Sequence, residues 1–175
     1  TMHGQIPAVD LGDGVTSVNM GKPGLKWDKV PLAENIPTLE LPIEGSPTAT
    51  GMGNPHCTFF VEDAEKINLE EMGPKFENHP LFPERTNVQF ASIIARDQIR
   101  MRVWERGAGV TLASGSSSCA TAVAANRKGL TEKKVQIELD GGILSVDWRE
   151  DGVWMTGPTM QVFTGSFSKE FLKSL

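Results

Sequence analysis

Short runs of alternating apolar and polar residues, separated by turn residues, recur along this 175-residue chain. In residues 99–105 every second residue up to Val103 is apolar, and Glu105 ends the same row. This is the period of a strand, in which successive side chains point to opposite faces. Similar runs lie at 86–94, 135–139, 144–148 and 153–156. Together with turns at 140–142 and 150–152, and with 18 glycines and 11 prolines, they predict a β-rich chain of antiparallel strands with few helices.

Two segments predict helices. Residues 115–128 open with three serines, continue with small apolar residues from Cys119 to Ala125, and end in a basic turn followed by Gly129. Serines favour the start of a helix, and a basic last turn followed by glycine favours its end. Because the middle of this segment is apolar all round, we expect strands to bury it on several sides. A second helix begins at Leu69, and Gly73 and Pro74 predict that it is short.

Composition limits the classes of function. A chain with 39% hydrophobic and 22% charged residues can bury one sizeable core and a second small lobe. The 17 Lys and Arg are scattered and the net charge is −5, which disfavours a nucleic-acid surface and favours small-molecule partners. No apolar run is long enough for a membrane span, and the first residues do not resemble a signal peptide, so we expect a cytoplasmic protein.

The two cysteines, Cys57 and Cys119, form no Cys-x-x-Cys pair and have no histidine at ligand spacing. We therefore expect reduced thiols, with neither a disulfide framework nor a metal site.

Three loops carry residues that could do chemistry, and each also has a structural interpretation. Asn54 and His56 end a glycine-rich turn, which could be a structural loop or part of a site. Asn87 follows a charged turn at 82–86 that could simply be solvated. Glu105, followed by Arg106, ends an apolar row, where a carboxylate is costly unless it is paired, functional, or located at a frayed strand end.

The fourth segment, 113–119, leads directly into the predicted buried helix. Ser114, Gly115 and Ser116 leave the backbone N–H groups of the first turn uncovered. Such a turn suits a carboxylate or another anion, because the N–H groups and the helix dipole both favour negative charge. The alternative is a serine-rich helix cap with no ligand.

Taken in order, these segments resemble the diaminopimelate epimerase family over nearly the whole chain. The resemblance is carried by Gly-Asn-Pro-His at 53–56, Phe-Pro-Glu-Arg-Thr-Asn-Val at 82–88, Glu-Arg-Gly-Ala-Gly at 105–109, Thr-Leu-Ala-Ser-Gly-Ser at 111–116, Gly-Gly-Ile-Leu at 141–144 and Met-Thr-Gly-Pro at 155–158. Val-Asn-Met-Gly-Lys-Pro at 18–23 also fits the middle segment of that family.

The resemblance implies an α+β fold of two similar lobes, each an antiparallel β-sheet curled around a central helix, with the active site between the lobes. Residues 23–160 would be the carboxy-terminal lobe, with 115–128 as its central helix. Residues 1–22 would link it to an amino-terminal lobe that has no counterpart in this chain. Residues 161–175 would form a closing strand, near 161–167, and a tail that return to the missing lobe.

The resemblance also implies roles for individual residues. Gly115 and Ser116 would hold the reacting carboxylate through backbone amides, and Glu105 with the Arg106 backbone would receive the amino group. The side chains of Arg106, Asn54 and Asn87 would bind the far end of the substrate. His56 would sit beside the catalytic thiols and tune them. The family works without a cofactor, because two cysteines act as base and acid on opposite faces of the α-carbon, and helix N-termini stabilise the developing charge.

Ser114 departs from this pattern, because the family has its second catalytic cysteine at this position. An alcohol is far less acidic than a thiol and cannot serve comparably as the base without activation. Cys119 lies inside the predicted helix and Cys57 in a strand, so neither would replace the missing thiol. Ser114 is equally consistent with an engineered replacement, a natural loss of activity, or a cloning change.

Three functions remain open at this point. The first is an epimerase lobe that converts LL- to meso-diaminopimelate, for lysine and cell-wall precursor biosynthesis, and is disabled here by Ser114 and truncation. The second is another isomerase of the superfamily, of the proline racemase or phenazine-biosynthesis type. The third is a non-catalytic ligand-binding domain. Diaminopimelate and the missing lobe are the expected partners, and a homodimer is left open.

Overall fold

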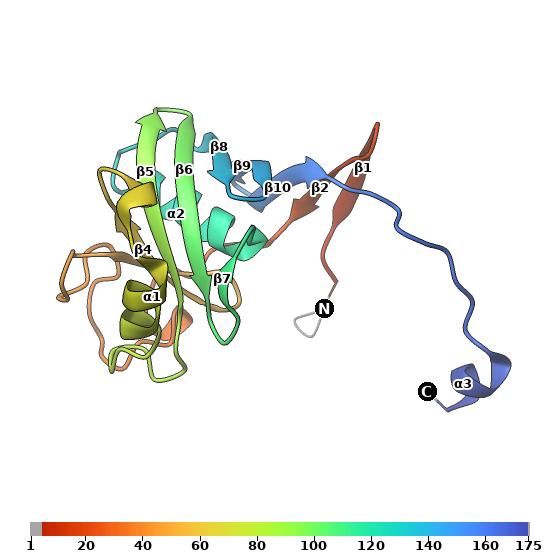
Figure 1. Cartoon of the computed structure of the whole chain (residues 1–175), viewed down its shortest axis with the longest axis horizontal. Coiled ribbons are helices and arrows are strands. Elements are labelled where there is room, and N and C mark those ends of the chain that lie inside the picture. The colour runs from red at the N-terminus through yellow and green to blue at the C-terminus, as the bar shows by residue number, and fades with distance from the viewer. Residues whose placement is uncertain (1–4, 175) are drawn as a thin grey trace.

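Helix α2 (Gly115–Arg127) runs through the interior of the computed structural model, which describes residues 5–174 (Figure 1). The prediction of a buried helix over 115–128 is confirmed, since every residue from Ser117 to Ala125 is buried. The helix ends before Gly129, whose φ of 71° is easily adopted only by glycine. The side chains along this stretch are short, so strands can approach the helix closely from several sides.

The strands form one ten-stranded sheet around this helix. They are β1 (Ala8–Gly12), β2 (Val15–Asn19), β3 (Thr48–Gly51), β4 (Pro55–Phe60), β5 (Asn87–Ala95), β6 (Gln98–Glu105), β7 (Gly109–Thr111), β8 (Lys134–Leu139), β9 (Gly142–Arg149) and β10 (Gly152–Pro158). Their order is β1-β2-β10-β9-β8-β6-β5-β4-β3, and β7 pairs with the last part of β6. The five strands predicted from alternation correspond to β5, β6, β8, β9 and β10, and both predicted hairpin turns are confirmed.

Helix α2 contacts strands from both halves of this order: β3, β4 and β5 on one side, and β8, β9 and β10 on the other. The sheet therefore curls around the helix, which confirms the predicted α+β class and the central helix. Most pairings are antiparallel, but β4 with β5 and β6 with β8 are parallel. Alternation alone does not distinguish these two directions, because both kinds of strand have the same period.

Two hydrophobic cores lie on opposite faces of the sheet. The helix-side core packs α2 against residues such as Met101 and Ile137. The opposite core is built around Phe59, Phe76 and Phe90, whose rings lie 4.4 and 5.0 Å apart between centroids in the two pairs that include Phe59.

Helix α1 (Leu69–Glu77) covers the opposite core and is longer than predicted. The sequence predicts an early stop at Pro74, yet the helix continues for three more residues. Phe76 and Glu77 are both buried by this continuation, so packing of the last turn offsets the backbone hydrogen bond that Pro74 removes. Short 3-10 turns at Trp27–Lys29 and Ala64–Lys66 join the remaining segments.

Residues 8–19, which lie in the predicted linking segment 1–22, form the β1–β2 hairpin and pair with β10. The turn contains Asp13 and Gly14, both with positive φ, and Asp-Gly is a strong hairpin signal. This hairpin therefore extends the sheet of the lobe. Residues 1–4 lie outside the described residues, and the linking role of the whole segment stays a prediction.

After β10 the chain leaves the sheet and runs to the short helix α3 (Lys169–Lys173), far from the central helix in Figure 1. Residues 161–167 form no strand in this structure. Their large apolar side chains are mostly exposed: Val162 by 85%, Phe163 by 82% and Phe167 by 73%. The predicted return of 161–175 to another lobe is untested, and residue 175 itself lies outside the described residues.

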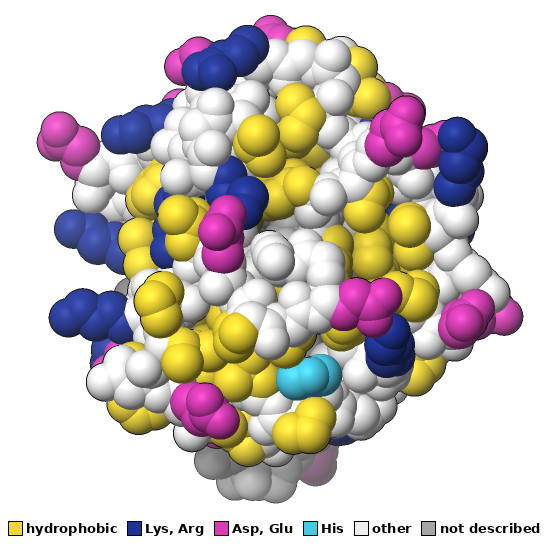
Figure 2. Space-filling view, turned by 90° about the vertical axis from the view of Figure 1, so that its left-hand side faces the viewer, with side chains coloured by type: hydrophobic (Ala, Val, Ile, Leu, Met, Phe, Trp, Pro, Cys, Tyr) yellow, Lys and Arg dark blue, Asp and Glu magenta, His cyan; other side chains and the backbone are white. Residues whose placement is uncertain are grey.

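The surface shown in Figure 2 carries Lys and Arg side chains at separate places, mixed with acidic and hydrophobic ones. This matches the scattered cations of the sequence. Within the described part of the chain, no helix has the length and apolar character needed to cross a membrane.

We expect the substitution Gly73→Ala to destabilise the protein. A Cβ at Gly73 would overlap the indole of Trp104, and Trp104 is held by a 2.6 Å hydrogen bond from its Nε1 to Glu77. Overpacking costs up to about 3 kcal/mol and the gain in helix propensity returns about 1 kcal/mol, so the free energy of unfolding should fall by about 2 kcal/mol. Urea titration measures the change, and Glu70→Ala on the exposed side of α1 is the control that should change it by less than about 0.5 kcal/mol. An unchanged or raised stability of Gly73→Ala would contradict the described packing.

Candidate active site

The residues singled out from the sequence meet where β4, β5 and β6 approach the start of α2. In the register, His56 of β4 lies beside Asn87 of β5, and Val88 lies opposite Trp104, which places Glu105 next to Asn87 at the same end of the sheet. His56, Asn87 and Glu105 share the helix-side face by alternation. Ser114 precedes α2 at this end, so four segments distant in sequence contribute to one site.

Glu105 is the acceptor at the centre of this site. Its Oε2 accepts a hydrogen bond from Ser114 Oγ at 2.8 Å, and its Oε1 accepts one from Thr111 Oγ1 at 2.6 Å. The sequence leaves open whether Glu105 is paired, functional, or simply exposed at a frayed strand end. In the structure it is half-buried, and both of its oxygens are paired with hydroxyls, so the frayed-end interpretation is wrong.

Ser114 itself is buried, and its hydroxyl takes part in a directed chain of hydrogen bonds. Ser114 Oγ also lies 2.9 Å from Ser117 Oγ, which in turn receives a hydrogen bond from Gln89 Nε2 at 3.0 Å. A hydroxyl has one proton, and a carboxylate can only accept. Because the single Ser114 proton goes to Glu105, Ser117 donates to Ser114, and Gln89 donates to Ser117.

His56 joins this chain from the other side and is fully buried. Its Nδ1 lies 3.1 Å from Gln89 Nε2, and its Nε2 lies 2.8 Å from Asn54 Oδ1. The Gln89 amide nitrogen can only donate, so Nδ1 accepts and Nε2 carries the proton that goes to Asn54. Burial, helped by the positive charge of Arg106, lowers the pKa of His56 from 6.5 to about 3. The imidazole is therefore neutral in this site at neutral pH.

Asn87 and Arg106 are linked to each other. Asn87 Nδ2 donates to the Pro55 carbonyl at 2.9 Å, and its Oδ1 accepts from the Arg106 backbone N–H at 3.0 Å. The Arg106 guanidinium donates to the Glu84 carbonyl at 2.9 Å. The Asn87 amide and the Arg106 N–H thus have protein partners here, whereas the half-buried Arg106 side chain keeps donors for a ligand. The substrate contacts expected of these two residues stay predictions.

The first turn of α2 presents free backbone donors. Ser118 N–H makes the first helical hydrogen bond, to the Ser114 carbonyl at 3.0 Å. Among the described residues, no acceptor is found for the N–H groups of Gly115, Ser116 and Ser117, and the Ser114 side chain does not cap the helix. Gly115 is held against Met155: a Cβ there would lie 2.8 Å from the sulfur. The turn is therefore an uncapped helix start, and a side chain at 115 would have to displace the end of the Met155 side chain.

Both cysteines are buried in hydrophobic cores, Cys57 in the opposite core and Cys119 in the helix-side core. Burial raises the pKa of Cys119 to about 12 and that of Cys57 higher still. Neither thiol can form a thiolate at neutral pH. The prediction that neither replaces the thiol expected at position 114 is consistent with this burial.

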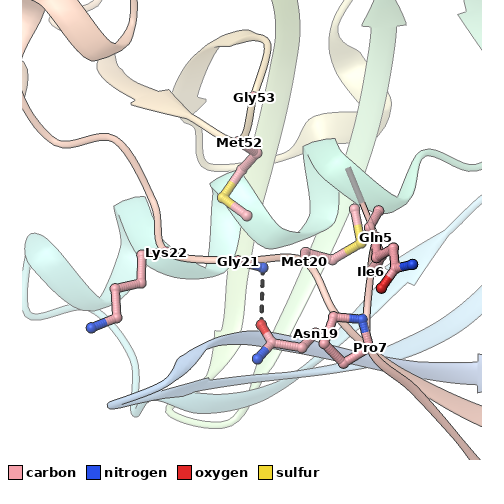
Figure 3. Close-up of a pocket in the computed structure, with 9 residues that line it drawn as sticks. All are labelled: Gln5, Ile6, Pro7, Asn19, Met20, Gly21, Lys22, Met52 and Gly53. Atoms are coloured by element: carbon pink, nitrogen blue, oxygen red, sulfur yellow. Dashed lines mark hydrogen bonds between the residues drawn. The ribbon is translucent and has the colours of Figure 1, made fainter. Parts of the chain in front are cut away.

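A cavity of about 470 Å³ borders the turn that carries Asn54 (Figure 3). Its walls come from residues 5–7, 19–22 and 52–53, and the Met52 side chain points into it from one side. Its opposite wall includes Asn19, whose Oδ1 accepts from the Gly21 N–H at 2.9 Å. The predicted site side chains do not line this cavity. Among the described residues no group of three or more His, Cys, Asp or Glu is arranged to hold a metal ion.

The sequence indicated Asn54, His56, Asn87, Glu105 and Ser114, and the structure joins all of these except Asn87 through two residues that the sequence analysis missed. Gln89 and Ser117 connect His56 to Ser114. A signal for Gln89 was present, because it follows Asn87 by two positions on the same face of a strand whose other residues are mostly apolar. Ser117 carried no distinguishing signal among three consecutive serines.

The fold is shared with solved racemases and epimerases. A probable proline racemase from Agrobacterium radiobacter K84 superposes with a TM-score of 0.62 over 94% of this chain and 59% of its own, at 15% identity. A predicted epimerase from Pseudomonas aeruginosa gives a TM-score of 0.56 over 87% of this chain and 58% of its own, at 17% identity.

Sequence comparison is more specific. The diaminopimelate epimerase family model matches residues 48–162. The diaminopimelate epimerase of Rhodospirillum centenum is 52% identical over 91% of this chain and 57% of its own length. That of Acidiphilium cryptum is 49% identical over 98% of this chain and 64% of its own length. The chain belongs to the diaminopimelate epimerase family, and it spans about three fifths of the length of these relatives.

His56 makes a pH-dependent contribution to stability. Its pKa is about 3 in the folded state and about 6.5 when unfolded, so the unfolded state binds more protons between these values. The contribution is fully present above pH 6.5 and is lost as the pH falls towards 3, by up to about 1.4 kcal/mol per pH unit. Urea titrations from pH 4 to 7 should therefore show a steeper loss for the parent protein than for His56→Gln. Parallel curves would show that His56 has nearly the same pKa in the folded and unfolded states, which would contradict its burial as a neutral imidazole.

Proposed function

We propose that this chain is the carboxy-terminal lobe of a diaminopimelate epimerase and supplies one half of the site in which LL-diaminopimelate is converted to the meso form. The observation that carries the proposal is the uncapped start of α2 beside Glu105 and Arg106. Three free N–H groups, a carboxylate and a guanidinium match the α-carboxylate, the amino group and the distal carboxylate of one substrate.

In this proposal the reacting carboxylate binds the N–H groups of Gly115 and Ser116. These donors stabilise the negative charge that develops when the α-proton is removed, and they need no reorganisation because the helix fixes them. Glu105 accepts from the substrate ammonium group. Arg106, with Asn54 and Asn87, recognises the far end, where a planar guanidinium suits a carboxylate. The buried, neutral His56 fixes Gln89 and Asn54 without adding a second positive charge.

Inversion at the α-carbon needs one group to take a proton from one face and another to return a proton on the other face. Ser114 is the group of this lobe at the required position, and the partner group belongs to an amino-terminal lobe. The Ser114 hydroxyl donates to Glu105 and is a poor acid and base compared with a thiol. We infer that this lobe binds substrate but does not exchange the proton efficiently.

The segment after β10 supports the proposal of a second lobe. Three of its apolar side chains, those of Met160, Val162 and Phe163, are more than four-fifths exposed. We propose that they pack on the amino-terminal lobe, where burial of each would contribute about 1.5–3 kcal/mol. The protein so completed would act on a soluble metabolite in the cytoplasm.

A second candidate function is a binding domain that has lost the chemistry. The observation that favours it is the Ser114 hydroxyl, which is buried and fully used by Glu105 and Ser117. A proline racemase-type activity is less well supported, because proline has no second polar end for Arg106 to bind.

The substitution Ser114→Cys distinguishes these functions in the complete two-lobed protein. We expect the thiol to raise the rate of α-proton exchange of diaminopimelate in deuterated water by at least about 100-fold, as a positioned acid–base group does. Proline should show no such exchange. The control adds Cys119→Ala to the Ser114→Cys protein; it removes a thiol inside the core and should leave the exchange rate nearly unchanged.

Three outcomes would contradict the proposal. The first is activity of the 175-residue chain alone well above background, which would exclude the two-lobe mechanism. The second is loss of activity in a folded Cys119→Ala protein, which would move the catalytic position. The third is a Ser114→Cys protein that binds diaminopimelate without exchange, which would establish the binding domain instead.

A further inference from the structure

Glu77, the last residue of α1, is a buried carboxylate on the face of the sheet opposite α2. Only 5% of the residue is exposed, and a carboxylate is rarely buried without several donors. Its Oε2 accepts from Trp104 Nε1 at 2.6 Å, and its Oε1 accepts from Arg85 Nη1 at 3.1 Å and from the Gly107 N–H at 3.0 Å. Arg85 lies in the loop before β5, Gly107 lies in the loop after β6, and Trp104 lies in β6 itself.

These loops carry the residues to which substrate contacts are assigned. Arg85 lies two residues before Asn87, and Gly107 directly follows Arg106. Successive amides of the turn after β6 are held from opposite directions, since the Arg106 N–H donates to Asn87 Oδ1 and the Gly107 N–H donates to Glu77 Oε1. The Thr86 N–H also donates to the Glu77 carbonyl at 3.2 Å. Glu77 thus contacts both loops through its side chain and one of them through its backbone as well.

The loop before β5 adopts a backbone conformation that needs support. Arg85 has a φ of 60°, which is costly for a residue with a side chain. Gly107, in the other loop, has a φ of 77°, which glycine adopts readily. The Arg85–Glu77 ion pair holds the strained residue in place. Because the Glu77 carboxylate is buried, water screens this ion pair less than it would screen a pair with an exposed carboxylate.

We propose that Glu77 is a positioning residue that sets the geometry of Asn87 and Arg106 for ligand binding, although it lies across the sheet from the ligand. The identity of the ligand rests on the proposed function, whereas the positioning does not. The carboxylate is required because three N–H donors converge on its two oxygens. An amide in its place would oppose at least one donor with another donor.

The test compares Glu77→Gln with Glu70→Gln in the complete protein, with Ser114 unchanged. Glu70 is on the same helix and exposed, so its substitution removes the same charge without touching the loops. For Glu77→Gln we expect hydrogen exchange of the Arg106 and Gly107 amides, measured without ligand, to accelerate at least about tenfold, with α2 and β8–β9 unchanged. The Kd for diaminopimelate, measured by calorimetry, should rise at least about tenfold, and Glu70→Gln should change neither quantity.

A merely structural role would give a different result, because global destabilisation accelerates exchange in α2 and β8–β9 as well. Uniform acceleration, or unchanged exchange at Arg106 and Gly107, overturns the proposal. If Glu77→Gln does not fold, Arg85→Met removes a single donor from a side chain that is 54% exposed and should give the same selective change. Absence of diaminopimelate binding by the parent protein, with selective exchange in Glu77→Gln, rejects the proposed function and leaves the positioning intact.

Discussion

The burial of α2 by strands on nearly all sides is the constraint on which the rest of the structure depends. A helix so enclosed can have only small side chains, and its central residues are Ser, Cys, Ala, Thr and Val. Its polar backbone ends still need partners, since buried N–H groups are costly when unpaired. The carboxy-terminal end is satisfied by the turn at Gly129, whose N–H donates to the Asn126 carbonyl. The amino-terminal end opens towards the site, and this asymmetry makes it the natural place for an anion.

Much of the fold can be predicted from local sequence pattern. A strand with one face on the core and one face in solvent has alternating apolar and polar residues, so such strands can be recognised in the sequence. Strands β5, β6, β8, β9 and β10 and helix α2 were predictable for this reason. Strand β3 was missed, and β4 was expected only at Cys57, because both strands are buried on both faces and so do not alternate. The length of α1 and the two parallel pairings depend on tertiary packing. Neither the length of this helix nor the direction of these pairings can be predicted from neighbouring residues in the sequence.

The candidate site was predictable only as a set of residues. The motifs placed Glu105 and Ser114 in one region, but the direction of the Ser114 hydroxyl depends on a network that spans β4, β5, β6 and α2. Gln89 and Ser117 act through this network and resemble ordinary core polar residues in the sequence. Glu77 is harder still, because it lies on the other face of the sheet and contacts the loops through the Arg85 guanidinium and main-chain N–H groups.

The pairing of β2 with β10 has a consequence for how the chain acquires its structure. Thr16 and Thr159, whose hydroxyls lie 3.1 Å apart, are separated by 143 residues in the chain. Closing so long a loop costs entropy before the contact stabilises anything, and folds rich in such contacts form slowly. During synthesis the β1–β2 hairpin leaves the ribosome well before β10, so the strand that pairs with β2 is absent until β10 is made. For that interval it is an unpaired sheet edge, and the cell's chaperones are the expected protection against aggregation at that edge.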